Sequence, residues 1–274
     1  YSQFGAGVRP EDINQALKGM GFLEVYDEFE ALEMFNAAVE LYIKENKDRA
    51  WAPRPLVSTV CPVVVRLIAY RFPSLLNHLP PILRPREIVA RDAKKETARK
   101  YGLREDEIKV FHITPCSAKL IAIKSPILPK DSYLDGAIGI NEVYHSVEKV
   151  LKEGHRPLEP PPNSIPFGIR WGKSGGEISG MEEGNFLAVS GLQEAIRYLE
   201  KIEMGLLDGF DYVEFRTTWE GCIGGALTVT DRYQAKHTID RMILKSGAEK
   251  KINRTQVKKL YEKGWFFTRH EPTP

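Results

Sequence analysis

Residues 108–119 read IKVFHITPCSAK, and this stretch decides how the fold is interpreted. Apolar residues alternate from Ile108 to Ile113, which predicts a strand. Pro115 and Cys116 follow directly, where a turn is expected. A side chain in a turn after a strand lies at the carboxyl edge of a parallel sheet, where α/β proteins bind ligands. The stretch therefore predicts a strand that presents a thiol.

The other two cysteines of the chain stand in similar places. A strand predicted over 212–215 precedes Cys222, and a short apolar stretch at 56–57 precedes Cys61. Glycines at 221, 224 and 225 leave room for the backbone to approach a bulky group. Thiolates in tight turns suit an iron–sulfur site, because cysteine sulfur is the preferred ligand there. The alternative is that free cysteines are simply small buried residues.

The remaining pattern alternates strands with helices. Helices are predicted over 10–23, 27–45, 63–70, 73–79, 86–101, 141–152, 192–205, 231–246 and 254–263, strands over 108–113, 137–138, 186–190 and 212–215, and a proline-rich connector over 155–166. Such alternation implies parallel sheets with crossover helices. We expect an α/β fold of two lobes, with mainly parallel twisted sheets flanked by helices and a cofactor cleft between them. Lobe 1–128 carries Cys61 and Cys116, and lobe 129–274 carries Cys222.

Composition excludes several classes of protein. The 39 basic and 37 acidic residues give a net charge of +2, so neither nucleic acid nor an anionic membrane is an expected partner. No apolar run approaches the ~20 residues that span a bilayer, and no secretory segment is recognisable. Three cysteines in 274 residues argue against a disulfide framework and for a reducing, cytoplasmic compartment. The chain begins at Tyr1, and we expect it to be a piece of a longer multidomain protein.

The three cysteine motifs resemble a known family when they are taken together. STVCP at 58–62, TPCSAK at 114–119 and EGCIGG at 220–225 resemble, in this order, the three H-cluster motifs of the [FeFe]-hydrogenase large subunit. WGKSGG at 171–176 is similar to that family's glycine-rich loop, and LAVSGL at 187–192 to the strand and turn that follow it. The resemblance covers most of the chain, and its details favour the divergent sensory branch of the family.

This resemblance implies an H-cluster in the cleft. A [4Fe–4S] cluster would take thiolates from Cys61, Cys116 and Cys222, and Cys222 would also bridge to a two-iron subcluster that carries CO, cyanide and a dithiolate amine. Lys119 matches the family lysine that donates a hydrogen bond to a cyanide. The implied reaction is the reversible cleavage of H2 into protons and electrons. Its implied partners are ferredoxin-like electron-transfer domains and signalling modules outside this chain.

The resemblance also assigns residues around the cofactor. Thr114 and Arg216 replace methionines that pack around the two-iron unit, although Arg216 has the alternative of pointing to solvent. Gly175 and Gly221 belong to loops that approach the cofactor. Glu40 matches a glutamate of the family's proton route by alignment of the helix at 29–41, and its alternative is a solvated carboxylate on a helix face. Lys119 and Glu40 are thus the expected catalytic residues.

The sequence departs from the family pattern at three positions. Thr218 stands where a fourth cubane cysteine is usual, so the cluster has three cysteines, is completed by another residue, or is absent. Val60 and Ala122 replace a cysteine and a glutamate that carry protons. Because positioned proton donors and acceptors typically contribute about two to four decades of rate, slow turnover or H2 sensing is expected. The alternatives are a non-catalytic iron–sulfur module and a metal-free interaction domain.

Overall fold

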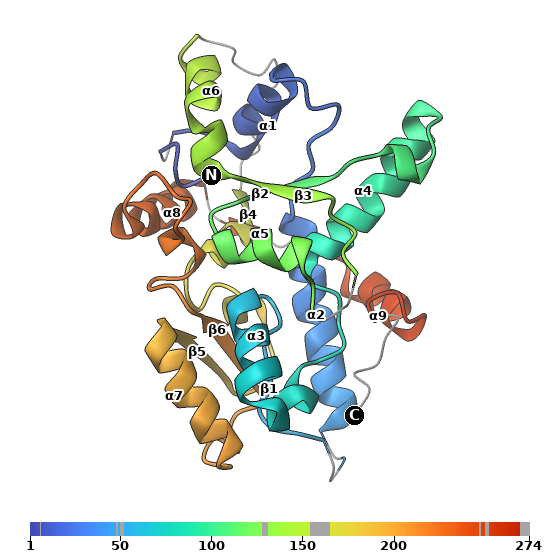
Figure 1. The fold of residues 1–274 in the computed structure, drawn as a ribbon, viewed down its shortest axis with the longest axis vertical. Coiled ribbons are helices and arrows are strands. Elements are labelled where there is room, and N and C mark those ends of the chain that lie inside the picture. The colour runs from blue at the N-terminus through green and yellow to red at the C-terminus, as the bar shows by residue number, and fades with distance from the viewer. Residues whose placement is uncertain are drawn as a thin grey trace.

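The computed structural model describes residues 1–5, 7–47, 49, 52–127, 131–153, 165–246, 248–249 and 252–268. The fold is mixed α/β, with parallel sheets flanked by helices, as the sequence predicts (Figure 1). Its α-helices are α1 (Pro10–Gly19), α2 (Phe29–Asn46), α3 (Pro62–Arg71), α4 (Pro85–Tyr101), α5 (Ser117–Lys124), α6 (Ile140–Lys152), α7 (Leu192–Glu203), α8 (Arg232–Ser246) and α9 (Arg254–Glu262). Its 3₁₀ helices are η1 (Pro73–His78), η2 (Glu105–Glu107), η3 (Phe167–Gly172), η4 (Ile178–Gly180) and η5 (Cys222–Gly224). Its strands are β1 (Leu56–Val57), β2 (Phe111–Thr114), β3 (Gly136–Gly139), β4 (Ile165–Pro166), β5 (Phe186–Ser190), β6 (Tyr212–Arg216) and β7 (Ala248–Glu249).

The largest sheet has β6 at its centre, parallel to β1 on one side and to β5 on the other. Successive side chains of a strand point to opposite faces. Val213 and Phe215 therefore pack together against α3 and α7, which cover the lower sheet in Figure 1. Tyr212, Glu214 and Arg216 point to the opposite face, and all five residues of β6 are buried. The strand thus carries two charged side chains into the interior.

The second sheet pairs β2 with β3 in parallel, from Phe111 against Gly136 to Thr114 against Gly139. A third, two-stranded sheet pairs β4 with β7. Two of these sheets join strands from both sides of residue 128, since β1 pairs with β6 and β2 with β3. The division into lobes 1–128 and 129–274 stays a prediction, and its boundary lies outside the described residues.

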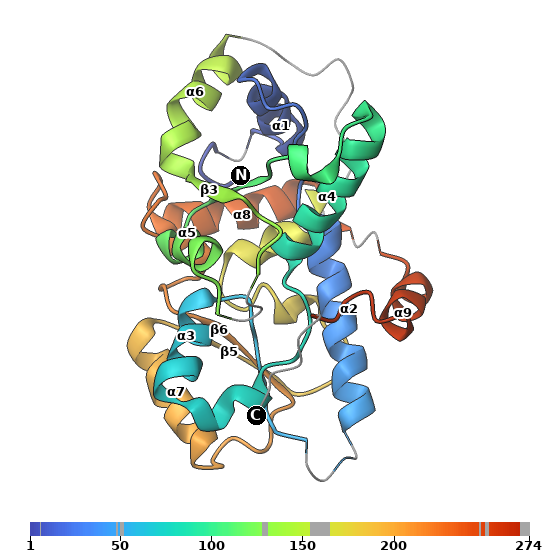
Figure 2. The same cartoon turned by 45° about the vertical axis from the view of Figure 1, so that its right-hand side comes forward.

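Several helix boundaries follow from proline and glycine. Pro62 and Pro85 stand at the first turns of α3 and α4, where their missing N–H costs no hydrogen bond. Gly102 ends α4 in the left-handed conformation, with φ 66°. The long α2 runs along the molecule beside α9 (Figure 2). These elements frame the interior on which the cysteine loops converge.

Some expectations need correction. The helix predicted over 73–79 is the 3₁₀ helix η1, and the helix predicted over 10–23 ends at Gly19, because Gly21 takes φ 103° in the following turn. Most of the predicted connector at 155–166 lies outside the described residues, but Ile165–Pro166 forms β4. In the described parts of the chain, no helix has both the length and the apolar character needed to cross a membrane.

Candidate iron–sulfur site

Cys61 and Cys222 lie at one edge of the largest sheet. Cys61 follows β1 and is the residue that caps the start of α3. Cys222 follows β6 and opens η5. Because β1 and β6 are parallel neighbours, their carboxyl ends meet at the same edge. The Cys61 sulfur lies 3.6 Å from the Thr217 hydroxyl oxygen, which belongs to the loop that leads to Cys222.

The loop after Cys222 brings Cys116 to the same region. Cys116 follows β2 and caps the start of α5. The Leu227 amide donates a hydrogen bond of 3.0 Å to the Pro115 carbonyl oxygen. Gly225 packs so closely that an added Cβ would lie 2.1 Å from that oxygen. The Cys222 loop therefore lies against the Pro115–Cys116 turn, and only glycine permits this approach at 225.

The electrostatics agree with this convergence. Burial raises the pKa of the Cys116 thiol, Lys119 lowers it, and the nearby Cys222 raises it. In the described residues, no three Cys, His, Asp or Glu side chains gather tightly enough to hold a single metal ion. A [4Fe–4S] cluster binds each thiolate at a different iron, so its ligands surround the cluster instead of meeting at one point.

A buried ionic network lies directly behind the cysteines. The Arg216 side chain is 1% exposed, and its Nη2 donates to Glu177 Oε2 at 2.8 Å and lies 3.5 Å from Glu214 Oε1. Glu177 also accepts hydrogen bonds from the Tyr212 hydroxyl at 2.6 Å and from the Ser58 hydroxyl at 3.0 Å. Both carboxylates are fully buried. Arg216 is thus the cation that balances two carboxylates, and the alternative that it points to solvent is wrong.

Glu214 also fixes the glycine-rich loop. It accepts backbone N–H bonds of 3.1 Å from Gly175, 3.1 Å from Glu177 and 3.2 Å from Ile178. Burial raises the pKa of Glu214 to about 7, against the opposing charge of Arg216. The loop at 175–178 is therefore held against β6 by a carboxylate whose charge depends on Arg216.

Arg216 reaches toward the thiols as well. Burial lowers its pKa, but Glu214 and Glu177, followed by Cys222 and Cys61, raise it above its ordinary value. The guanidinium therefore interacts electrostatically with the carboxylates of the network and with two of the cysteines. A fixed positive charge at this place favours an anionic metal cluster.

A cavity of about 570 Å³ opens beside Cys222. Its lining includes Lys119, Arg216 and Trp171. Arg216 Nε and Trp171 Nε1 are buried and find no hydrogen-bond partner within the described residues. Both groups can only donate hydrogen bonds, and buried donors without partners are costly. Cysteine sulfur, a lysine ammonium and free donors form a site that fits an anionic metal cofactor.

The other expected site residues have definite places. Thr114 is fully buried, and its hydroxyl accepts a bond of 3.2 Å from the Cys116 amide, so it holds the cysteine turn. Gly221 takes φ 94° and packs against the backbone of Ser174, where an added Cβ would lie 2.5 Å from the nitrogen. Glu40 pairs with Arg254 at 2.7 Å and is not among the residues that line the cavity. Its role in proton transfer stays a prediction.

The three departures from the family pattern also have structural counterparts. Val60 is buried and lines the cavity. Ala122 is buried on α5. The Thr218 hydroxyl donates a hydrogen bond of 2.6 Å to the Gly221 carbonyl oxygen. The hydroxyl proton is therefore used within the turn at 218–221. None of these side chains supplies a thiolate or carboxylate.

Sequence reasoning missed much of the interior around the site. Nothing in the sequence singles out Glu177 or the buried indole nitrogen of Trp171 as part of this site. The sequence YVEFR at 212–216 does indicate a buried charge, because two charged residues alternate with apolar residues in a predicted strand. The pairing of His112 with Glu28 had no local signal, because the two residues are far apart in the sequence.

Cysteine turns at the edge of a parallel sheet, next to a cavity with free donors, are the arrangement expected of an iron–sulfur protein. The chain matches the family described as "Iron only hydrogenase large subunit, C-terminal domain" over residues 2–154, which is more than half of its length. The chain belongs to this family.

Solved structures show the same fold. A variant of the [FeFe]-hydrogenase HydA1 from Chlamydomonas reinhardtii matches with a TM-score of 0.66 at 16% identity, covering 95% of this chain and 87% of that chain. A structure of HydA(deltaEFG) that reveals stepwise H-cluster assembly matches with a TM-score of 0.65 at 17% identity and the same coverage, 95% and 87%. A variant of apo HydA1 from Chlamydomonas reinhardtii gives 0.65 at 16% identity, again over 95% and 87%.

Proposed function

We propose that this chain is the H-cluster domain of a sensory [FeFe]-hydrogenase, with slow reversible cleavage of H2 or H2 sensing as its activity. The observation that supports the proposal is that the loop around Cys222 contacts both Cys61 and the Pro115–Cys116 turn, and that Cys222 lines a cavity with free hydrogen-bond donors. Membership of the family supports it. The proposal includes a cytoplasmic, anaerobic setting and electron-transfer and signalling domains outside this chain.

Cys61, Cys116 and Cys222 would hold a [4Fe–4S] cluster, and Cys222 would also hold the two-iron subcluster. When bound, this H-cluster supplies the centre at which H2 is cleaved into protons and electrons. Lys119 and Arg216 hold anionic ligands in place by charge and hydrogen bonding. Cys61 and Cys116 stand at the starts of α3 and α5, where the positive ends of the helices favour an anionic cluster.

Slow turnover follows from the lining of the cavity. Val60 lines it and has no exchangeable side-chain proton, and Ala122 likewise carries none. Loss of these two proton carriers lowers the rate of turnover, which suits detection of H2 better than rapid production of it. This is the support for the sensory assignment.

The proposal is tested by producing the protein anaerobically together with the hydrogenase maturation machinery and recording its infrared spectrum. We expect bands from bound CO and cyanide, accompanied by a cubane signal. A cubane without these bands would instead support a non-catalytic iron–sulfur module. This module is the second candidate function, because the chain has three cubane cysteines where the family usually has four. Protein without iron would leave the metal-free interaction domain.

The cubane of this chain is expected to have one labile iron. Only three cysteines are available, and Thr218 uses its hydroxyl proton on Gly221. Mild oxidation should convert the wild-type cluster to a [3Fe–4S] form that is visible by electron paramagnetic resonance. Thr218→Cys should suppress this signal several-fold by supplying a fourth thiolate.

Thr228→Cys is the matched control, because Thr228 donates an equivalent bond of 2.7 Å to the carbonyl oxygen of Gly225. It should leave the [3Fe–4S] signal unchanged. Equal suppression by both variants, or no signal in the wild type, would contradict a three-cysteine cubane with an open iron.

A further inference from the structure

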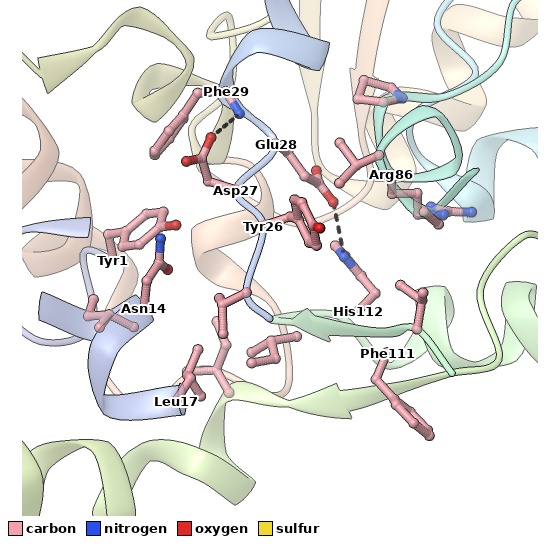
Figure 3. A pocket seen from close by; sticks show the side chains of 18 of the residues that line it. Tyr1, Asn14, Leu17, Tyr26, Asp27, Glu28, Phe29, Arg86, Phe111 and His112 are labelled. Atoms are coloured by element: carbon pink, nitrogen blue, oxygen red, sulfur yellow. Dashed lines mark hydrogen bonds and ion pairs between the residues drawn. The ribbon is translucent and has the colours of Figure 1, made fainter. Parts of the chain in front are cut away.

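The cavity beside Cys222 also contains a histidine–glutamate pair. His112, from β2, and Glu28, the residue before α2, both line the cavity. His112 Nδ1 lies 3.0 Å from Glu28 Oε1, as the dashed line in Figure 3 shows. The two residues join elements that are distant in the sequence, so the pair exists only in the folded chain.

The two members of the pair differ in their access to water. The His112 side chain is 12% exposed, and that of Glu28 is 29% exposed. The second ring nitrogen of His112, Nε2, is buried and has no partner within the described residues. The pair therefore joins a buried ring nitrogen to a partly exposed carboxylate, and both residues line the cavity.

The charges around the pair set its protonation. Burial lowers the pKa of His112, Glu28 raises it, and Lys119 and Arg86 lower it, so the pKa lies below the ordinary value and the ring is neutral at pH 7. Burial raises the pKa of Glu28, but His112, Lys119 and Arg86 bring it down to about 2. A carboxylate next to Nδ1 keeps the ring proton on Nδ1, and the lone pair of Nε2 is then free to accept a proton.

Lys119 places the pair close to the proposed cofactor. Its charge lowers the pKa of both His112 and Glu28, and it also lowers the pKa of the Cys116 thiol. Lys119 thus interacts electrostatically with both the pair and Cys116. The proton acceptor and the proposed reaction centre share one cavity.

We propose that His112 accepts the protons that this chain releases in its cavity, and that Glu28 positions the ring and passes the proton to water. The proposal rests on the proposed function, because cleavage of H2 produces protons that have to leave the cavity. Val60 and Ala122 cannot carry them. The His112–Glu28 pair would provide a route for protons. Neither residue belongs to the proton path that the family resemblance implies.

The transfer changes only N–H and O–H bonds, and no electrons move. Nε2 of His112 accepts a proton, and the resulting imidazolium is stabilised by the Glu28 carboxylate. The proton on Nδ1 then passes to Glu28, which releases it to water because a carboxyl group of such low pKa holds a proton only briefly. The ring, now protonated on Nε2, returns to its starting form by rotating or by exchanging its proton with water.

The first test uses the protein without cofactor and measures the histidine rings by two-dimensional proton–nitrogen NMR. His112→Gln assigns the signals, and the neutral ring of His112 is expected to carry its proton on Nδ1. In Glu28→Gln this preference should be lost, and the pKa of His112 should fall further because the carboxylate that raises it is gone. A wild-type ring protonated on Nε2 would overturn the proposal.

The second test uses the matured protein and compares infrared bands with H2 turnover. His112→Gln should keep the bands of the wild type but lose about two to four decades of rate, which is typical for removal of a positioned proton acceptor. His237→Gln is the control, because His237 is exposed on α8 and does not line the cavity. Its rate should equal that of the wild type.

The outcomes separate this inference from the proposed function. Bands present with an unchanged rate in His112→Gln would overturn the role of His112 and leave the proposed function standing. Bands absent from the wild type would contradict the proposed function, and the role of His112 would fall with it. Glu28→Gln should lower the rate less than His112→Gln and shift the pH profile of the rate.

Discussion

Arg216→Met is expected to lower the free energy of unfolding by about 3–5 kcal/mol, because breaking a buried ion pair leaves uncompensated charge in the interior. Arg216 is the cation 2.8 Å from Glu177 and 3.5 Å from Glu214, and both carboxylates are fully buried. Urea unfolding at pH 8 of the protein without cofactor measures the effect. Methionine approaches the length of arginine, so the loss of charge is the main change.

The pH dependence gives this prediction a specific sign. The pKa of Glu214 is about 7 in the folded state and about 4.3 in the unfolded chain. The folded state therefore binds the proton more tightly, and stability should fall as pH rises between these two values. In Arg216→Met the fall should extend to higher pH, because loss of the cation that favours the carboxylate raises the pKa of Glu214 further. Adding Glu214→Gln should recover part of the lost stability at pH 8.

Arg71→Met is the control for loss of an arginine. Arg71 pairs with Glu200 at 2.9 Å on the surface, with side chains 53% and 41% exposed. Exposed ion pairs contribute about 0–1 kcal/mol, so this variant should unfold nearly as the wild type does. If Arg216→Met and Arg71→Met had the same free energy of unfolding at pH 8, Arg216 would not be the residue that balances the charge of the buried carboxylates.

The second large effect is expected in Cys222→Ser, which should lose nearly all of its iron. A serine hydroxyl forms its alkoxide only with difficulty at neutral pH, so it does not replace a thiolate on iron. Cys61→Ser and Cys116→Ser should each lower the iron content strongly as well. The measurement is iron and acid-labile sulfide per chain after anaerobic reconstitution. We expect about four of each in the wild type.

Thr217→Val is the matched control for the cysteine variants. The Thr217 hydroxyl lies 3.6 Å from the Cys61 sulfur, but it is not a proposed ligand. The variant should keep its iron, and circular dichroism should show that all variants fold. Iron retained in Cys222→Ser at the level of Thr217→Val would remove Cys222 from the ligand set.

Local patterns predicted much of the fold. The strands that precede Cys116 and Cys222 form as β2 and β6, as their apolar patterns indicate, although β2 begins at Phe111 and not at Ile108. The parallel sheets follow from the same alternation of strands and helices. The sequence could not show that β1 pairs with β6 across most of the chain, because strand pairing over such distances has no local signature.

The site was predictable to the extent that it depends on motifs. Cys61, Cys116 and Cys222 stand in turns that the sequence identifies, and the fold brings the turns together. The environment of the thiols was not predictable, because it depends on Glu177 and on the burial of Arg216. The same holds for His112, whose partner Glu28 becomes a neighbour only after folding.

The most direct measurement is the position of iron in crystals of the reconstituted protein, located by anomalous scattering at the iron edge. We predict a single cluster of iron atoms within bonding distance of the sulfurs of Cys61, Cys116 and Cys222, adjoining the cavity that Lys119 lines. Iron bound elsewhere, or three sulfurs with no iron between them in protein that has been reconstituted, would contradict the account.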